Sequence, residues 1–194
     1  MVSQLKVNEI IKQSGSSITI GESGDTVTIP SGATLNAAGS TSGLGKVAQV
    51  LSTTKTDTFT VNSRSYSAIT GLSVSITPSS TSSKILVIVS LQAVSSNNGD
   101  AVILRDSTQI GVGDTSSSRT SGSFGDFYNG GGTALTSNSA SVLDSPSSTS
   151  AITYSVSCLT ASSSVFYVNR TTTDTDSSSY SRGASTITVM EILA

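Results

Sequence analysis

The sequence contains no histidine and a single cysteine, and these two facts limit the chemistry that it could carry out. Without an imidazole there is no Ser-His-Asp triad, no histidine metal site and no histidine acid–base catalysis. One cysteine, Cys158, cannot form an intramolecular disulfide or a zinc site built on cysteine pairs. Cys158 alternates in phase with Ile152, Tyr154 and Val156 and has no basic neighbour in sequence. We therefore predict a buried, unreactive thiol.

Carboxylate pairs are the remaining route to catalysis, because two carboxyl groups that flank a glycosidic bond can hydrolyse it. The candidates are seven aspartates: Asp100, Asp106, Asp114, Asp126, Asp144, Asp174 and Asp176. Most of them lie in segments typical of turns, where Asp is favoured because its side chain bonds to nearby backbone. Asp174 and Asp176 lack the Gly and Glu that an EF-hand loop would place beside them. The sequence therefore predicts a protein that is not an enzyme and that uses no metal or cofactor.

Two long loops, residues 113–133 and 171–183, hold the side chains that could bind a ligand. They contain four of the nine aromatic residues: Phe124, Phe127, Tyr128 and Tyr180. Rings of this kind pack on sugars while Asp and Asn bind sugar hydroxyls, and long loops on a rigid scaffold often carry binding surfaces. The candidate ligand-binding residues are Arg119, Asp126, Tyr128, Asn129, Asp174, Asp176 and Tyr180. The alternative is that the rings hold the loops against the sandwich or a neighbouring subunit; for Phe124, Phe127 and Tyr128 we favour burial, against a neighbouring subunit.

The element that must position these loops is organised around residues 84–94, the longest apolar run in the chain. In a strand, alternate residues point to opposite sides. One side would carry Ile85, Val87, Val89 and Leu91, and the other Leu86 and Ile88. We predict a central strand that is covered on both faces. A buried helix is the alternative, and the turn-forming residues on both sides of the run and its β-branched residues argue against it.

Further alternating segments follow and precede this strand. We predict strands at 67–69, 72–77, 134–143, 152–158, 165–169 and 185–192, a pair of strands at 47–51 and 56–61, and a hairpin of 101–104 with 109–112. Eight to ten short strands separated by Ser, Gly and Asn are typical of a β-sandwich or jelly roll. The predicted fold is all-β, with a jelly-roll-type sandwich as the head domain over residues 46–194.

The amino-terminal part differs from the head. Residues 1–16 are predicted to be an attachment arm, strand or helix, whose apolar residues Leu5, Val7, Ile10 and Ile11 dock on another molecule. Residues 17–45 are predicted to be a β-repeat stem and linker, because an apolar-Thr-apolar unit with a Gly-containing turn recurs there. Such short repeats are stable when they stack on copies of themselves. We favour copies in neighbouring chains around a threefold axis; a hairpin lying on the main domain is the alternative.

The composition supports assembly. The chain has 44 Ser and 27 Thr among 194 residues, but only 11% charged residues. A lone soluble monomer usually relies on surface charge for solubility, so we predict a homotrimer. No signal peptide and no membrane span are predicted. The ten Lys and Arg form no cluster, which argues against a nucleic-acid partner.

Several motifs resemble a module of tail fibres and related virion proteins of marine and cyanobacterial bacteriophages. They are residues 70–87, Leu104-Arg-Asp-Ser-Thr108, Leu143-Asp-Ser-Pro146 followed by Tyr154, Val168-Asn-Arg170 and residues 184–192. Residues 3–8 and the repeat at 18–35 are similar to the amino ends of such fibres. The resemblance covers most of the chain and brings no catalytic residues with it.

The resemblance implies a trimeric virion appendage. Its amino end would attach to the particle, through a tail adaptor, nozzle or capsid protein, and its β domain would face the host and bind a surface glycan or lipopolysaccharide. A capsid decoration or head-fibre protein is the nearest alternative. A glycan-degrading, tailspike-like hydrolase is the alternative from another class, and the chain is short and poor in paired carboxylates for that function.

Overall fold

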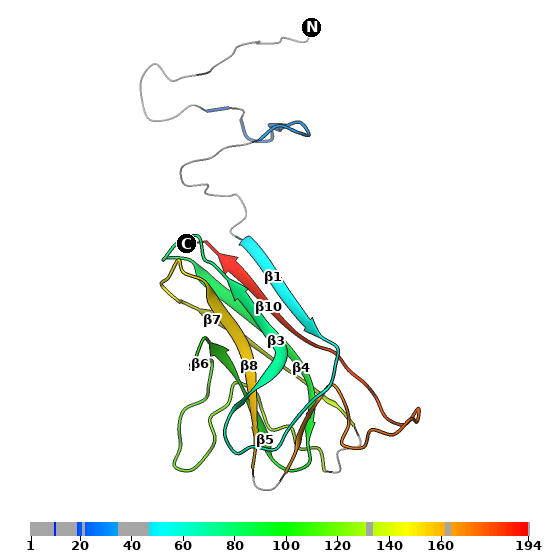
Figure 1. Ribbon diagram of the computed structural model, residues 1–194. Coiled ribbons are helices and arrows are strands. Elements are labelled where there is room, and N and C mark those ends of the chain that lie inside the picture. Colours follow the sequence, from blue (N-terminus) through cyan, green and yellow to red (C-terminus); the bar gives the residue numbers. More distant parts are fainter. Residues whose placement is uncertain are drawn as a thin grey trace. The chain divides into compact units, whose positions relative to one another are not determined.

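The computed structural model describes residues 10, 19–20, 22–34, 47–130, 134–161 and 164–193, and within them it is all-β, with ten strands and no helix. The chain divides into two compact units, Met1–Leu44 and Gly45–Ala194. All ten strands belong to the second unit, which we call the head (Figure 1).

The first unit contains the turns of the predicted repeat. Gly24 and Gly32 have positive φ angles of 96° and 84°, a conformation that glycine adopts without strain. The turns are closed by hydrogen bonds from Asp25 N to Glu22 O and from Ala33 N to Pro30 O, both 3.0 Å. Residues 26–29 pair with no other described residue of the single chain, and the predicted stacking of this repeat on neighbouring chains stays a prediction. A strand this short has no stability without a neighbour.

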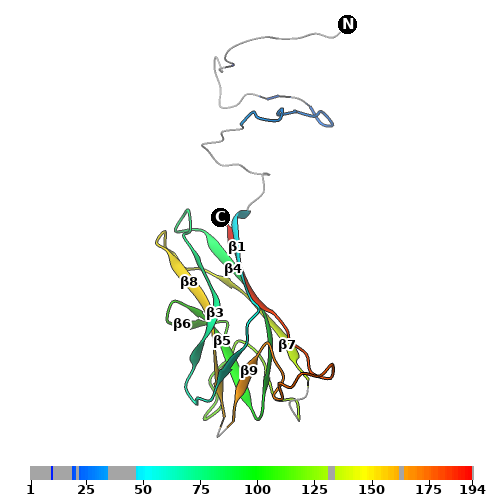
Figure 2. The ribbon, with the colours of Figure 1, turned by 45° about the vertical axis from the view of Figure 1, so that its right-hand side comes forward.

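The strands of the head form two antiparallel sheets that face each other as a sandwich (Figure 2). Their bounds are β1 (Val47–Lys55), β2 (Phe59–Val61), β3 (Ser67–Ile76), β4 (Lys84–Ser95), β5 (Gly99–Arg105), β6 (Thr108–Ile110), β7 (Thr136–Asp144), β8 (Ile152–Thr160), β9 (Phe166–Val168) and β10 (Ser185–Ile192). The larger sheet has the order β1-β10-β4-β9-β2, with β7 paired to β4, and the smaller sheet has the order β3-β8-β5-β6. The prediction of a β-sandwich with eight to ten strands is confirmed.

The long-range pairing is nested. The first strand pairs with the last, β1 with β10; β3 pairs with β8; β4 pairs with β7; and β5 pairs with β6. The innermost pair is the hairpin predicted around residues 105–108, where Asp106 takes a left-handed φ of 52°. Starting from the tip of this hairpin, each further pair therefore joins one strand that precedes the hairpin to one strand that follows it.

The core lies between the sheets and follows the predicted alternation. From β3 it receives Leu72, Val74 and Ile76, and from β8 it receives Tyr154 and Cys158. The predicted burial of Cys158 is confirmed, since its side chain is fully buried, and burial raises the pKa of its thiol to about 12. A thiol in this state is a small apolar core residue.

Strand β4 is central to its sheet, as predicted, but it is covered on one face only. Ile85, Val87 and the following alternate residues are fully buried against the smaller sheet. On the outer face Leu86 is half-buried and Ile88 is 38% exposed. The prediction of a strand covered twice is therefore wrong for the single chain, because a two-layer sandwich buries only the inner face of each sheet.

The predicted pair of strands at residues 47–51 and 56–61 is also wrong. β1 pairs with β10, and β2 pairs with β9. The physical reason is the fully buried Asn169, whose side-chain amide donates hydrogen bonds to Lys55 O (2.9 Å) and Asp57 O (3.0 Å). These bonds hold the chain where it passes from one partner strand to the other.

Three of the motif residues meet between the sheets. Arg105, at the end of β5, donates to both carboxylate oxygens of Asp144, at the end of β7, at 2.9 and 3.1 Å. The hydroxyl of Tyr154 donates to the same carboxylate at 2.7 Å. These charge-assisted bonds connect the larger sheet to the smaller one at a point where the core ends.

A buried carboxylate on β10, Glu191, binds both β1 and the turn between β3 and β4. Glu191 is fully buried and accepts hydrogen bonds from Gln49 Nε2 (2.6 Å), Ser79 N (2.7 Å) and Ser79 Oγ (2.6 Å). Burial raises the pKa of this carboxyl, but these hydrogen bonds outweigh it and bring the pKa to about 2. The β3–β4 turn is thus attached to the larger sheet by an ionised group.

A chain that begins at Lys46 should fold without the residues before it, because all strands and core residues found among the described residues lie in the head. We expect a β-rich far-UV circular dichroism spectrum and one cooperative thermal transition. Aggregation, or a transition without cooperativity, would show that the preceding residues complete the core.

Candidate functional site

The head has two different ends. At one end lie the start of β1 and the end of β10, where Val47 pairs with Ile192. Toward the opposite end lie the two long loops, between β6 and β7 and between β9 and β10 (Figure 1). A ligand bound by the loops would therefore be held far from the place where the chain enters the head.

The β6–β7 loop is fixed to the scaffold by Phe127. Its backbone accepts a hydrogen bond from Ser95 N (2.9 Å) and donates one to Gly99 O (3.2 Å). Its ring is fully buried, 5.0 Å from the ring of Phe166 and 6.1 Å from that of Phe124. The predicted burial of this phenylalanine is confirmed, but the ring packs in the core of its own chain and not against another subunit.

The first candidate site, the Asp100 pocket, lies between this loop and the ends of β5 and β8. It has a volume of about 350 Å³ and is lined by Asn98, Gly99, Asp100, Arg119, Thr120, Asp126, Leu159 and Ala161. One oxygen of Asp126 accepts hydrogen bonds from Gly99 N (3.0 Å) and Tyr128 N (3.2 Å), so this carboxylate shapes the pocket wall.

Asp100 is the more unusual carboxyl of this pocket. Burial raises its pKa, the hydrogen bond from Ala101 N lowers it, the charge of Asp126 raises it again, and the result is a pKa of about 6. Its oxygen Oδ1 lies 1.9 Å from the position that a Cβ on Gly122 would occupy. Only a glycine at 122 lets the loop pass this close to the carboxyl.

The second candidate site, the Tyr180 pocket, belongs to the β9–β10 loop. It has a volume of about 360 Å³ and is lined by Asp174, Thr175, Asp176, Ser177, Tyr180 and Arg182. The base of the loop is closed by backbone contacts: an antiparallel β-bridge pairs Arg170 with Arg182, and Gly183 N donates a hydrogen bond to Asn169 O at 3.1 Å. The rigid base follows from the buried Asn169 described above.

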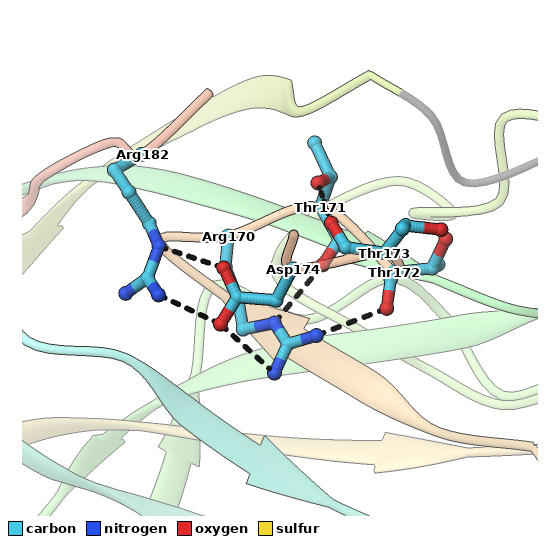
Figure 3. A network of polar contacts seen from close by, with 6 residues as sticks. All are labelled: Arg170, Thr171, Thr172, Thr173, Asp174 and Arg182. Carbon is cyan, nitrogen blue, oxygen red and sulfur yellow. Dashed lines mark hydrogen bonds and ion pairs between the residues drawn. The ribbon is translucent and has the colours of Figure 1, made fainter. Parts of the chain in front are cut away.

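Figure 3 shows how the loop is held above its base. Arg182 binds the carboxylate of Asp174 through two nitrogens, at 2.9 and 2.7 Å, and Arg170 approaches the same carboxylate at 3.4 Å. Arg170 also donates to the carbonyls of Thr171 and Thr172, at 3.0 Å each, and lies 5.0 Å from the ring centroid of Tyr167. The side chain of Arg182 remains 59% exposed and is available to a ligand.

The sequence-predicted receptor residues fall into three groups. Arg119 and Asp126 line the Asp100 pocket, whereas Asp174, Asp176 and Tyr180 line the Tyr180 pocket. Tyr128 and Asn129, whose side chain donates to Ala134 O, line neither pocket. The burial that was favoured for the ring of Tyr128 is wrong, since this residue is 48% exposed. The seven residues therefore do not form one site.

Some residues of the pockets were missed by sequence reasoning, and one group of predictions is not covered by the structure. Arg182 was not predicted to bind a ligand, and Asp100 was named only among the aspartates that could form a catalytic carboxylate pair. The surroundings of both depend on partners that are distant in sequence or on the other side of a loop. Of the four predicted attachment residues, Ile10 is 59% exposed, and Leu5, Val7 and Ile11 lie outside the described residues.

No protein-family model matches the chain, and no curated protein matches it. In the described part of the chain, no three His, Cys, Asp or Glu side chains are grouped so that they could hold a metal ion. Nor do the described residues include a helix with the length and hydrophobicity of a membrane span.

Replacing Phe127 by Ala should lower the free energy of unfolding by about 3–5 kcal/mol, because a fully buried ring is lost and a cavity is left. Urea denaturation would measure the change. Replacing the neighbouring Tyr128 by Ala is the matched control and should change the free energy by less than about 1 kcal/mol, because its ring is half exposed. Equal losses for the two variants would contradict the burial of Phe127.

Asp100→Asn should stabilise the head near neutral pH. The pKa of about 6 lies above the ordinary value of 3.8, so the carboxyl favours folding below pH 3.8, and this contribution is lost as the pH rises through about 6. The amide of the variant does not ionise, so its contribution to stability does not fall as the pH rises. The gain in unfolding free energy of the variant over the unchanged protein should therefore be larger at about pH 7 than at about pH 4. The same gain at both pH values would show that the carboxyl is not desolvated.

Proposed function

We propose that this chain is a non-enzymatic, homotrimeric virion appendage of the bacteriophage tail-fibre type, whose amino end attaches to the particle and whose head binds the host surface. The observation that carries this proposal is that the two ends of the head differ. The chain enters at one end, and the two loops with their polar pockets lie toward the other. A protein that links a particle to a cell needs these two functions at separate ends.

We further propose that the head is a jelly roll. Its support is the nested pairing of β1 with β10, β3 with β8, β4 with β7 and β5 with β6. A long antiparallel ribbon that is paired in this way and then wrapped into two sheets gives the jelly-roll order. Strands β2 and β9 are an additional pair at the edge of the larger sheet. Viral capsid and lectin domains use this architecture, which agrees with a virion protein that binds sugars.

The receptor class that fits the loops is a surface glycan or lipopolysaccharide. The Tyr180 pocket offers an aromatic ring, carboxylate and hydroxyl oxygens, and the exposed guanidinium of Arg182. Oxygen acceptors suit sugar hydroxyls, an aromatic ring suits the apolar face of a sugar, and a guanidinium suits carboxylate or phosphate substituents. The loop base is rigid, so little ordering would oppose binding.

The nearest alternative, a capsid decoration or head-fibre protein, uses the same fold with a different docking partner. The number of copies per particle separates the two, because a decoration protein follows the capsid lattice and a fibre follows the smaller symmetry of the tail. Quantitative mass spectrometry of purified particles would give this number.

A second candidate, glycan hydrolysis, is favoured by one observation: Asp100 and Asp126 line the same pocket, and the pKa of Asp100 is about 6. A raised pKa is what a general acid needs. The backbone hydrogen bonds to Asp126 argue for a structural carboxylate instead. Release of reducing sugar by the purified protein, abolished by Asp100→Asn, would establish hydrolysis; we expect none.

Arg182→Ala should weaken the binding of the full chain to immobilised lipopolysaccharide or capsular polysaccharide by about tenfold, the loss of one charge-assisted contact. The melting temperature should hardly change, because an ion pair this exposed contributes little to stability. Biolayer interferometry on glycans from a panel of marine and cyanobacterial strains would measure the affinity. Arg64→Ala removes the same charge from another exposed position and should bind as the unchanged protein does. If both variants bind normally, the Tyr180 pocket is not the receptor site.

A further inference from the structure

The outer face of the larger sheet is divided into a polar half and an apolar half. Toward the loops, its outward residues are hydroxyls and an amide: Thr54, Thr186, Ser90, Gln92, Ser137 and Ser139. Toward the start of β1, the outward residues other than Lys84 are aliphatic: Val47, Val50, Met190, Ile192, Leu86, Ile88 and Leu143. We call these seven residues the aliphatic patch.

The strand register makes the aliphatic patch continuous. Val50 pairs with Met190, Met190 pairs with Leu86, and Leu86 pairs with Leu143. Paired residues lie on the same face of a sheet with their Cβ atoms about 5 Å apart, so these side chains form one row across four strands. On one side of this row lies the pair of Val47 with Ile192. On its other side lies Ile88, whose paired residues Thr188 and Ser141 mark the boundary with the polar half of the face.

The patch is exposed in the single chain. Val47 is 50%, Val50 53%, Ile88 38% and Leu143 55% exposed. Isolated apolar side chains on a surface are ordinary, but a contiguous patch indicates an interaction site. The outer face of the smaller sheet provides a comparison within the same molecule, because there β3 presents the exposed Ser73 and Ser75. The aliphatic patch is therefore a local departure from the pattern of this protein.

From this patch we infer that copies of this chain associate through the outer face of the larger sheet at the end where β1 begins. The seven residues carry no charge, and the only charged residue paired with them, Lys84, gives its ammonium to Ser145 Oγ at 3.2 Å. A single lysine at the margin of the patch gives a partner of opposite charge little to bind. A flat, uncharged row of aliphatic side chains matches a second copy of itself.

The position of the patch supports the same occupant. Val47 is both the first residue of β1 and a member of the patch, so copies that meet here bring their chain entries together. The inference rests on the homotrimer of the proposed function and names the face through which the copies meet. It explains why β4 has apolar residues on both faces: the inner row packs in the head, and Leu86 and Ile88 pack between copies.

The mass of the full-length chain in solution tests this inference. The unchanged protein should sediment as a trimer, and Leu86→Glu combined with Met190→Glu should sediment as a monomer, because two buried charges per copy would oppose association. Thr70→Glu combined with Ser73→Glu adds the same charges to β3 on the other sheet and should remain a trimer. A monomeric unchanged protein, or a double patch variant that keeps its full mass, would overturn the inference. A dimer that the patch variant dissociates would support this interface and contradict the trimer.

Thiol protection provides a second measurement that does not depend on a charged variant folding. Cys158 is fully buried, so a cysteine introduced at the surface is the one that reacts. In the native protein, Ile88→Cys should react with a maleimide about tenfold or more slowly than Ser73→Cys, although position 88 is open to solvent in the single chain. Equal rates would overturn the inference, whatever the outcome of the glycan-binding experiment.

Discussion

The structure depends on one constraint: each sheet of the head has an apolar inner face that only the other sheet can cover. The inner row of β4, from Ile85 to Leu91, packs against residues of the smaller sheet such as Leu72 and Tyr154. Neither sheet can exist alone in water, so the two must form together. Because β1 also pairs with β10, the first and last strands of the head are joined in the same step. The head is expected to unfold as a single unit for this reason.

Much of this arrangement could be predicted from the sequence, because alternation shows which residues of a strand share a face. It does not show which strands pair, and so the partners of β1 and β2 were predicted wrongly. Pairing is decided here by buried polar groups such as Asn169 and Glu191, which bind segments that are distant in sequence. An isolated Asn or Glu in a sequence gives no sign that its amide or carboxylate will be enclosed.

The candidate sites were predicted in part for the same reason. Loop length and composition identified the β6–β7 and β9–β10 loops, and several of the expected residues line the two pockets. The sequence did not show that Phe127 divides its loop into a buried anchor and an exposed remainder. Nor could it show that Arg182 and Arg170 share one carboxylate, since that depends on how the loop closes. Residues that form an ion pair only when a loop closes follow no periodic pattern in the sequence, so the sequence does not predict the pair.

The low charge of the chain has different consequences at the loop end of the head and at its aliphatic end. Hydroxyl side chains keep the outer sheet faces hydrated without charge, so most formal charges of the described head lie in loops and turns. With a net charge of −2, long-range attraction to a ligand is weak, and recognition must come from short-range contacts in the pockets. The same lack of charge removes the repulsion that normally keeps like surfaces apart. A surface of this kind favours association at its aliphatic end and leaves selective polar contacts to its loop end.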